Sequence, residues 1–379
     1  MKYVQINAYS GGWAENIVFK KHRELIANGD ESWVFWARGN HEQDDHCKRI
    51  ASMHEVYFDG LQTRIDGKPG FHSKGITRRL LTELEKINPD VVHLHVLTGY
   101  YINIEMLFDW LSERQCKINW TLHDCWDFTG HCIYFTNVCC EQWKTGCAFS
   151  KSCPQKREYP ESWLAGDNTV RKNWEKKRQI FTMLPPERVQ LITPSEWLAG
   201  LVRQSFLGKY RVKVIHNTVN TEFFKPTPSD FRERFRLHNR TVVLGVASKW
   251  SERKGLQDFI RLGNDLDSNY YAVVVIGLSD KQIKQVMSRS KHIVALPKTS
   301  TQLDLVRAYS AADILFNPTV EDNYPTVNLE SEACGTPVVT YDTGGCRETI
   351  HLADSKVAAN YDDALNIIKD MRKTGVDSS

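Results

Sequence analysis

Short apolar runs alternate with longer segments of helical periodicity along most of this chain. Tyr3–Ala8 and Asp90–Leu97 have the length and apolar content of buried strands. Ile76–Ile87 instead repeats apolar residues at helical spacing and stops at Asn88-Pro89. Alternation of strands with amphipathic helices favours a parallel sheet covered by helices on both faces. The pattern therefore predicts an α/β fold.

This alternation occurs twice, on either side of the proline-rich segment Phe224–Pro228. We expect an N-terminal domain over residues 1–224, interrupted by an irregular insert over residues 125–160, and a C-terminal domain over residues 225–379. Further strands are predicted at Ser32–Ala37, Lys117–Leu122, Gln190–Thr193, Val212–His216, Val242–Ala247, Ala272–Ile276, Ile293–Leu296, Asp313–Asn317 and Pro337–Thr340. Helices are predicted over Trp13–Asn28, Ile102–Arg114 and Trp163–Leu184, and from Glu196, Gly255, Asp280 and Thr301.

The most distinctive segment follows the apolar run at 314–316. It is acidic and broken by prolines, and it continues through a short helix into Cys-Gly-Thr-Pro-Val-Val at 334–339. Asp322 lies at the mouth of a strand, and Glu330, eight residues later, lies in the next helix. Open α/β sheets bind ligands at the carboxyl ends of their strands. Two carboxylates above a helix N-terminus can hold a polyhydroxylated ligand while the free amides bind its anionic part, which indicates a site for a nucleotide-activated sugar.

A basic loop follows the predicted strand Val242–Ala247. It reads Ser-Lys-Trp-Ser-Glu-Arg-Lys-Gly over 248–255 and carries Lys249, Arg253 and Lys254. Lysines can neutralise phosphate charge, and the start of a helix offers free N–H groups, so this loop predicts a diphosphate site. The alternative is a solvated loop whose cations contact only water.

Two polar turns in the first half are further candidates. Gly11-Gly12 follows the first strand, where a tight turn lets backbone amides approach a phosphate. His123-Asp124 ends the strand Lys117–Leu122, where loops carry function. Gly11-Gly12 lacks the Gly-x-Gly-x-x-Gly pattern of a dinucleotide site, which counts against NAD.

The acidic segment resembles the signature of retaining glycosyltransferases of family 4, and the chain is similar to those of exopolysaccharide and colanic-acid biosynthesis. The usual form is Glu, seven residues, Glu, then a helix of small residues and Cys-Gly-x-Pro-Val. Here Asp322 takes the first acidic position, with Glu321 one residue earlier. The resemblance implies a GT-B fold, in which two Rossmann-like domains face each other across a cleft. It also implies that the final helix, Ala364–Lys373, crosses back onto the first domain.

The resemblance implies roles for these residues. Glu330 is expected to hold the ribose hydroxyls, Lys249 and Lys254 the leaving diphosphate, and Asp322 with the amides of 323–326 the transferred sugar. Attack from the same face, without a covalent intermediate, is expected, and no catalytic metal is required. The donor-binding candidates are Gly11, Gly12, Lys249, Arg253, Lys254, Asn323, Tyr324, Thr326 and Glu330, and the catalytic candidates are His123, Asp124 and Asp322.

Three alternatives remain at this point. A nucleotide-sugar epimerase shares the architecture but needs no acceptor site, which the large insert disfavours. A metal-dependent hydrolase would use His93, His95 and His123, although such His-x-His pairs belong to a single closed barrel rather than to two halves. A catalytically inactive sugar-binding protein is the third.

Cysteines are concentrated in the insert. This segment resembles a cysteine-bearing segment of related exopolysaccharide transferases. Four thiolates there would order an irregular loop around a structural Zn²⁺. Their spacing is wider than that of a zinc knuckle, and reduced, packed thiols are the alternative. The strongest ligand candidates are Cys132, Cys147 and Cys153, with Cys139 or Cys140 as the fourth.

Composition limits the remaining possibilities. The chain has 379 residues, of which 41% are hydrophobic, as in soluble globular proteins, and its net charge of +3 is too small to predict nucleic-acid binding. No signal peptide or membrane-spanning stretch is expected, so we predict a cytoplasmic protein.

The predicted helix over 163–184 is basic and aromatic. Such a helix suits contact with a membrane surface or with a lipid-diphosphate acceptor; the alternative is a face that is merely solvated. Its basic residues are Arg171, Lys172, Lys176, Lys177 and Arg178.

Overall fold

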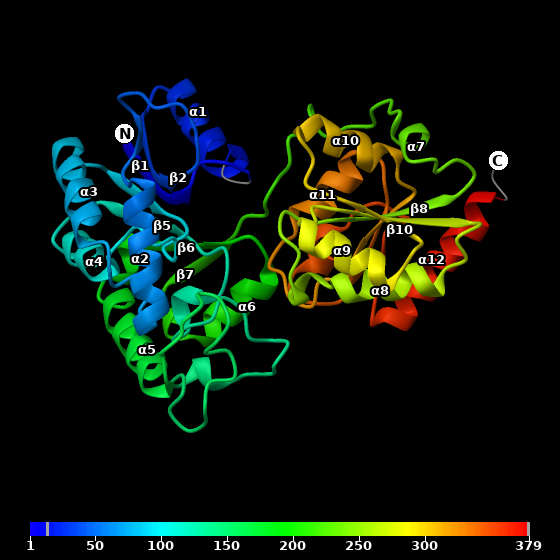
Figure 1. Ribbon diagram of the computed structural model, residues 1–379. Coiled ribbons are helices and arrows are strands. Elements are labelled where there is room, and N and C mark those ends of the chain that lie inside the picture. The colour runs from blue at the N-terminus through cyan, green and yellow to red at the C-terminus, as the bar shows by residue number, and fades with distance from the viewer. Residues whose placement is uncertain (13–14, 377–379) are drawn as a thin grey trace. The chain divides into compact units, whose positions relative to one another are not determined.

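Each half of the chain forms its own parallel sheet (Figure 1). The structure, a computed structural model, describes residues 1–12 and 15–376. It divides into two units, Met1–His216 and Asn217–Ser379. The predicted α/β architecture is confirmed, with one Rossmann-like sheet in each unit.

The first unit contains a seven-stranded sheet, counted over the described residues, in the order β3-β2-β1-β4-β5-β6-β7. The strands are β1 (Lys2–Tyr9), β2 (Glu31–Arg38), β3 (Cys47–Arg49), β4 (Val91–Leu94), β5 (Lys117–Thr121), β6 (Val189–Thr193) and β7 (Arg211–Val214). The helices are α1 (Lys20–Ala27), α2 (Met53–Asp66), α3 (Lys74–Ile87), α4 (Ile104–Ser112), α5 (Asp167–Phe181) and α6 (Glu196–Gln204). A π-helical turn, η1 (Glu15–Phe19), precedes α1, and the predicted start of that helix at Trp13 lies outside the described residues.

The second unit contains a six-stranded sheet, again over the described residues, in the order β10-β9-β8-β11-β12-β13. The strands are β8 (Thr241–Val246), β9 (Tyr271–Ile276), β10 (Ile293–Leu296), β11 (Ile314–Asn317), β12 (Val338–Tyr341) and β13 (Lys356–Ala358). The helices are α7 (Phe231–Arg234), α8 (Leu256–Asp265), α9 (Asp280–Arg289), α10 (Gln302–Ala311), α11 (Thr326–Ala333) and α12 (Tyr361–Val376). The last of these packs on β12 and β13, with Ala364 and Ile368 fully buried. Phe224 packs against Tyr309 of this unit, so the compact boundary precedes the expected one at 224.

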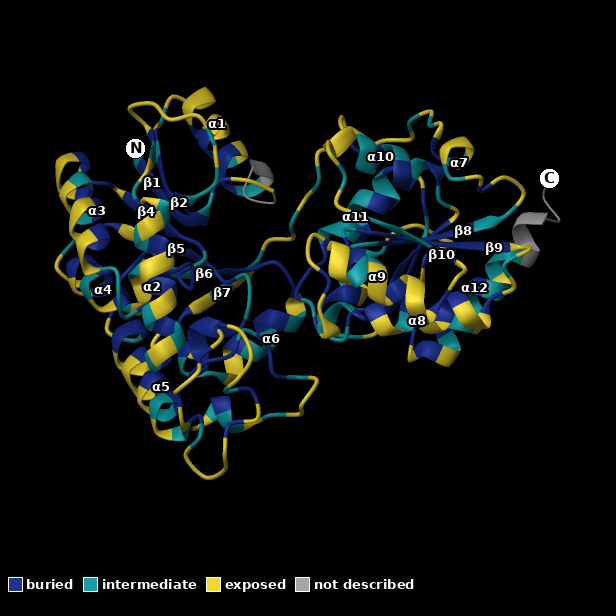
Figure 2. Cartoon of the chain, in the orientation of Figure 1, coloured by how far each residue is buried: buried dark blue, intermediate teal, exposed yellow. Residues whose placement is uncertain are grey.

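Helix α2 was not predicted because its buried face is partly polar. It buries Asp59 and Thr63, whereas Tyr57 and Phe58 are exposed, which hides the usual apolar periodicity (Figure 2). Its ends follow standard rules nevertheless. Ser52 and Glu55 form a capping box at the N-terminus, and Gly67, at φ 71°, ends the helix in the left-handed region.

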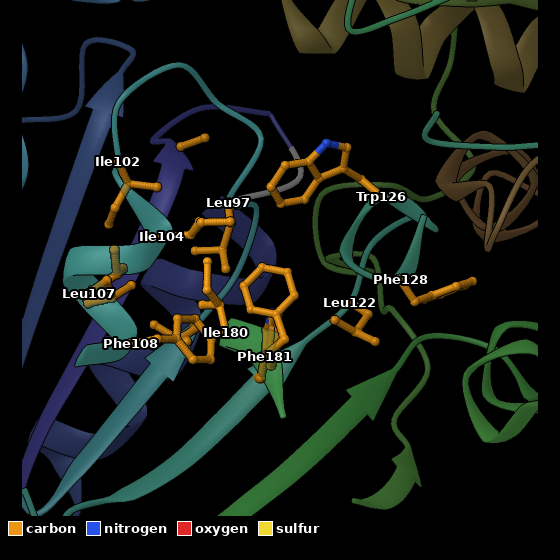
Figure 3. Packing of buried hydrophobic residues seen from close by; sticks show 14 of the residues in the cluster. Leu97, Ile102, Ile104, Leu107, Phe108, Leu122, Trp126, Phe128, Ile180 and Phe181 are labelled. Atoms are coloured by element: carbon orange, nitrogen blue, oxygen red, sulfur yellow. The ribbon is translucent and has the colours of Figure 1, made fainter. Parts of the chain in front are cut away.

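The core of the first unit centres on aromatic rings between the sheet and helices α4 and α5. Phe181 of α5 is fully buried, with ring centroids 4.9 Å from Phe108 and 4.8 Å from Trp120. Figure 3 shows Phe181 among Phe108, Leu122 and Trp126. This packing anchors α5, which follows the insert, against the strand that precedes the insert.

We expect Phe181→Ala to destabilise the protein by about 3–5 kcal/mol, because a buried ring is replaced by a cavity. The unfolding free energy can be measured by urea titration followed by circular dichroism. Phe149→Ala is the matched control, since Phe149 is 73% exposed, and it should change stability by less than about 0.5 kcal/mol. Equal effects of the two substitutions would contradict this description of the core.

Candidate functional site

In the second unit, the loops that carry the predicted donor residues leave neighbouring strands at the point where strand order reverses. From β8 the chain goes to β9 and β10 on one side and later returns to β11 on the other. The loop after β8 carries Lys249, Arg253 and Lys254, and the loop after β11 carries Asp322. A reversal of this kind is where open α/β sheets bind ligands.

An ion pair joins these two loops. Lys254 Nζ lies 2.5 Å from Asp322 Oδ2, and Arg253 Nη1 lies 3.7 Å from the same oxygen. Arg253 also donates to the carbonyl of Glu321, and the amide of Val320 donates to the carbonyl of Arg253 at 2.9 Å. The structure therefore brings together two of the three predicted phosphate-binding cations, Arg253 and Lys254, and the first predicted acid.

The two cations decide the charge of Asp322. Burial by itself would raise the pKa of this carboxyl, but Lys254 and then Arg253 outweigh it and hold the pKa below its ordinary value. The amide of Asn323 also donates to Asp322 Oδ1 at 2.9 Å. Asp322 is therefore an anion throughout the neutral pH range.

Two glycines make this close approach possible. Gly255 has φ 73°, and a Cβ there would lie 2.4 Å from the carbonyl oxygen of Pro318. Gly344 has φ 58°, and a Cβ there would lie 1.9 Å from the carbonyl oxygen of Asp322. Both positions require a left-handed backbone and no side chain.

The second predicted acid has neutral partners. Glu330, in α11, accepts a hydrogen bond from the Tyr309 hydroxyl of α10 at 3.0 Å. Burial raises the pKa of Glu330 to about 7, although hydrogen bonds from Tyr309 and Thr326 oppose the rise. Glu330 therefore changes charge near neutral pH. Sequence reasoning missed Tyr309 because it lies 21 residues earlier, on a different helix.

The remaining donor candidates surround the start of α11. Asn323 and Tyr324 are buried, and Thr326 is the first residue of the helix and partly exposed. Lys249 is exposed in the loop after β8 and forms no ion pair with any described residue. Behind the loop, Asn328 accepts from Asn317 and donates to Thr349, both at 2.8 Å. That buried amide network holds α11 against β11, and no sequence motif indicated it.

In the first unit the strand order reverses between β1 and β4. Gly11 and Gly12 follow β1, are exposed and have no described atom within 4 Å of an added Cβ; Gly12 has φ 65°. His123 follows β5, which pairs with β4. Asp124 Oδ1 accepts from the amide of Trp126 at 2.8 Å, so Asp124 orients the start of the insert.

Three histidines form a column across β4 and β5. His93 contacts Tyr3 and Thr121 through its two ring nitrogens, at 3.1 and 2.8 Å. Its ring stacks on His95 with centroids 4.1 Å apart, and His95 Nδ1 lies 3.4 Å from His123 Nε2. Burial lowers the pKa of His93 to about 3 and that of His123 to about 4, so both rings are neutral at physiological pH.

The hydrolase alternative loses its structural basis. It depended on a closed barrel, whereas the described strands form two open sheets. Among the described residues, no group of three or more His, Cys, Asp or Glu side chains is arranged to hold a metal ion as it stands.

The insert contains only two short 3-10 turns between β5 and α5 in the described chain, η2 (Trp126–Phe128) and η3 (Gln142–Lys144). Cys132, Cys147 and Cys153 are buried, Cys140 is partly buried and Cys139 is exposed. Burial, followed by the neighbouring thiols Cys147, Cys153 and Cys140, raises the pKa of Cys132 well above its ordinary value. Four of the five predicted cysteines therefore lie near one another.

Helix α5 is less basic on its surface than its sequence indicates. Lys172, Lys176 and Arg178 are exposed, but Lys177, predicted on the basic face, is 1% exposed. It lies on the same stripe as Val170 and Trp174, toward the core. Burial lowers the pKa of Lys177 to about 7, although Asp127 and nearby thiols oppose this. No helix in the described residues is long and apolar enough to cross a bilayer.

Comparisons with known proteins identify relatives over both units. Residues 11–223 match the family described as "Glycosyltransferase Family 4", and residues 240–374 match "Glycosyl transferases group 1". The chain is 24% identical to the putative colanic acid biosynthesis glycosyl transferase WcaC of Escherichia coli over 392 aligned residues, which cover 97% of this chain and 90% of WcaC.

Solved structures share the fold. The chain superposes on sucrose-phosphate synthase from Thermosynechococcus elongatus with a TM-score of 0.67 and 14% identity, covering 98% of this chain and 90% of that one. It also superposes on Anabaena Alr3699/HepE in complex with UDP-glucose, with a TM-score of 0.66 and 13% identity. This superposition covers 99% of this chain and 90% of that one. These similarities support the predicted GT-B fold.

We expect Gly344→Ala to destabilise the protein by about 3 kcal/mol, because its methyl group collides with the carbonyl of Asp322. Gly335→Ala is the matched control: Gly335 also has a positive φ, 85°, but its nearest atom, in Pro226, is 3.4 Å away. That control should lose only about 1 kcal/mol. The melting temperatures of the two variants distinguish them, and a smaller loss for Gly344→Ala would contradict the tight loop packing.

Proposed function

The chain belongs to glycosyltransferase family 4, and on that basis we propose that it transfers a sugar from a nucleoside diphosphate donor to a glycan or lipid-linked acceptor. The transfer retains the configuration of the anomeric carbon. The reaction belongs to polysaccharide biosynthesis, a proposal that the similarity to the colanic acid transferase of Escherichia coli supports.

One observation supports the donor site above all. Two cations from the loop after β8 meet the Asp322 carboxylate from the segment after β11 where the strand order reverses. A nucleoside diphosphate sugar has complementary chemistry, with anionic phosphates next to two hydroxyl-bearing rings. Phosphates can replace the Asp322 carboxylate as partners of Lys254 and Arg253, and the freed carboxylate can then accept hydrogen bonds from the sugar.

Catalysis in this proposal is mainly electrostatic. The bond between the anomeric carbon and the diphosphate oxygen breaks, and the acceptor oxygen bonds to the same face of that carbon. Negative charge grows on the leaving diphosphate, where Lys249, Arg253 and Lys254 stabilise it. Because these cations supply the positive charge, no catalytic metal is needed. Glu330 holds the ribose hydroxyls.

The first unit supplies the acceptor side. His123 is proposed to lie at the reaction centre, with Asp124 orienting its loop, and Gly11 and Gly12 to approach the donor phosphates. A lipid-linked acceptor would require peripheral membrane contact on the cytoplasmic side, for which the exposed Lys172, Lys176 and Arg178 are available.

Thermal shift with UDP-glucose tests the donor site directly. A ligand present at about 100 times its Kd stabilises the folded protein by about 2.7 kcal/mol, so the melting temperature should rise. Uridine, guanosine and thymidine diphosphate sugars should be screened in parallel. If none of them raises the melting temperature, the donor proposal is wrong.

We expect Lys254→Ala and Glu330→Ala each to lower the rate of transfer by about 10²-fold while the protein stays folded. The first removes a cation from the leaving group, and the second removes an acceptor of ribose hydroxyls. Lys281→Ala, an exposed lysine on α9, is the matched control and should retain full activity. Near-normal turnover in both site variants would refute these assignments.

Donor affinity should also depend on pH. The pKa of Glu330 is raised to about 7, so the carboxyl gains charge as the pH rises through 7, and the carboxylate accepts ribose hydrogen bonds better. UDP-glucose affinity, measured by calorimetry from pH 6 to 8, should therefore increase with pH. Glu330→Gln should bind with little pH dependence, and a wild-type affinity that falls over this range would contradict the role of Glu330.

A further inference from the structure

The insert is a long segment with little regular structure. Apart from two 3-10 turns, described residues 122–166 contain no helix or strand. Structureless loops of this length are uncommon inside compact domains and need their own source of order. Side chains of α5 supply part of it, since Trp174 Nε1 donates to the carbonyl of Trp143 at 3.0 Å and Lys177 Nζ to that of Trp126 at 2.6 Å.

Four thiols of the insert line one small cavity. Cys132, Cys140, Cys147 and Cys153 all contribute to its wall, whereas the adjacent Cys139 is exposed. The cavity measures about 10 Å³, roughly the space that one water molecule needs. The structure thus separates two neighbouring cysteines that the sequence left equivalent.

The same cavity has polar wall atoms that lack partners. His131 is fully buried, and its Nδ1 has no hydrogen-bond partner among the described residues. The Oε1 atom of Gln142 is also buried and also lacks a hydrogen-bond partner among them. The amide of Gly130 donates to Cys147 Sγ at 3.2 Å. Buried polar atoms normally have partners, so these walls are suited to a polar or ionic occupant.

A buried lysine lies beside the thiols. Lys177 is 1% exposed and interacts electrostatically with Cys147 and Cys132, while its Nζ lies 3.6 Å from the centroid of the Trp126 ring. A buried ammonium group is costly unless negative charge is near it. Asp127 is one source of such charge, and thiolates at Cys132 and Cys147 would add to it.

We propose that Cys132, Cys140, Cys147 and Cys153 bind one structural Zn²⁺ ion that orders the insert. The thiols surround a common cavity but are not yet at coordinating positions, so the ion would draw them inward by side-chain rotation. Each thiol loses its proton to solvent, and four thiolates with Zn²⁺ leave a net charge of about −2, which Lys177 partly offsets. This proposal is independent of the donor and acceptor assigned above.

Metal analysis of the purified full-length protein tests the site. We expect about one zinc ion per chain by plasma mass spectrometry, released when a mercurial reagent blocks the thiols. Cys140→Ser should lose most of the zinc. Two controls should retain it: Cys139→Ser changes the exposed neighbour, and Cys116→Ser changes a buried thiol outside the insert.

Lys177→Met tests the charge argument, because it keeps the length of the side chain but removes the ammonium group. It should weaken zinc affinity by about 10–100-fold in a chelator competition assay.

A spectroscopic measurement on the wild-type protein covers the case in which Cys140→Ser does not fold. Protein exchanged with Co²⁺ should show the visible absorption of tetrahedral cobalt and the near-ultraviolet bands of thiolate ligation. A folded wild-type protein that contains no stoichiometric metal, or equal zinc loss in Cys139→Ser and Cys140→Ser, would overturn the proposal. The cavity would then hold only packed, protonated thiols and water.

Discussion

The reversal of strand order beside β8 is the constraint on which the candidate site depends. Because β8 pairs with β9 on one side and with β11 on the other, the loops that follow β8 and β11 start next to each other. Lys254 and Asp322 are 68 residues apart in sequence and meet only through this pairing. In the parallel pair of β8 and β11, Val243 lies opposite Ile314 and Leu244 opposite Leu315. This register sets where each loop begins.

The surroundings of the two acids give them different electrostatic behaviour. Asp322 faces Lys254 and Arg253, which lower the pKa of its carboxyl despite burial, whereas Glu330 faces the neutral hydroxyls of Tyr309 and Thr326 and has a raised pKa. The first therefore stays charged and the second titrates near neutral pH. A ligand that binds both must displace cations from one and form hydrogen bonds with the other.

The first unit combines a parallel sheet with an irregular insert. His93 and His95 are buried and His123 is partly buried, and desolvation lowers the pKa of all three rings, so His123 stands at the end of β5 without a charge. The insert that follows has no sheet to satisfy its backbone. It relies instead on turn hydrogen bonds within its own backbone, such as that from the amide of Cys125 to the carbonyl of Ile133 at 2.9 Å. Donors from α5, among them Trp174 and Lys177, and side chains of the insert, such as Thr129, which donates to the carbonyl of Cys132 at 2.6 Å, supply the rest.

The sequence by itself determined eleven of the thirteen strands in the described residues, the division into two sheets and the positions of the acidic and basic loops, because periodicity, glycine and proline act over short distances. It missed the two short edge strands, β3 and β13. It did not predict α2, whose buried face includes Asp59 and Thr63. Only the tertiary structure decided that Lys177 is buried, that Tyr309 contacts Glu330, and that Cys140 rather than Cys139 joins the other thiols. Each of these depends on contacts between segments far apart in the chain, or on which way a side chain points in an irregular loop, and no local pattern carries that information.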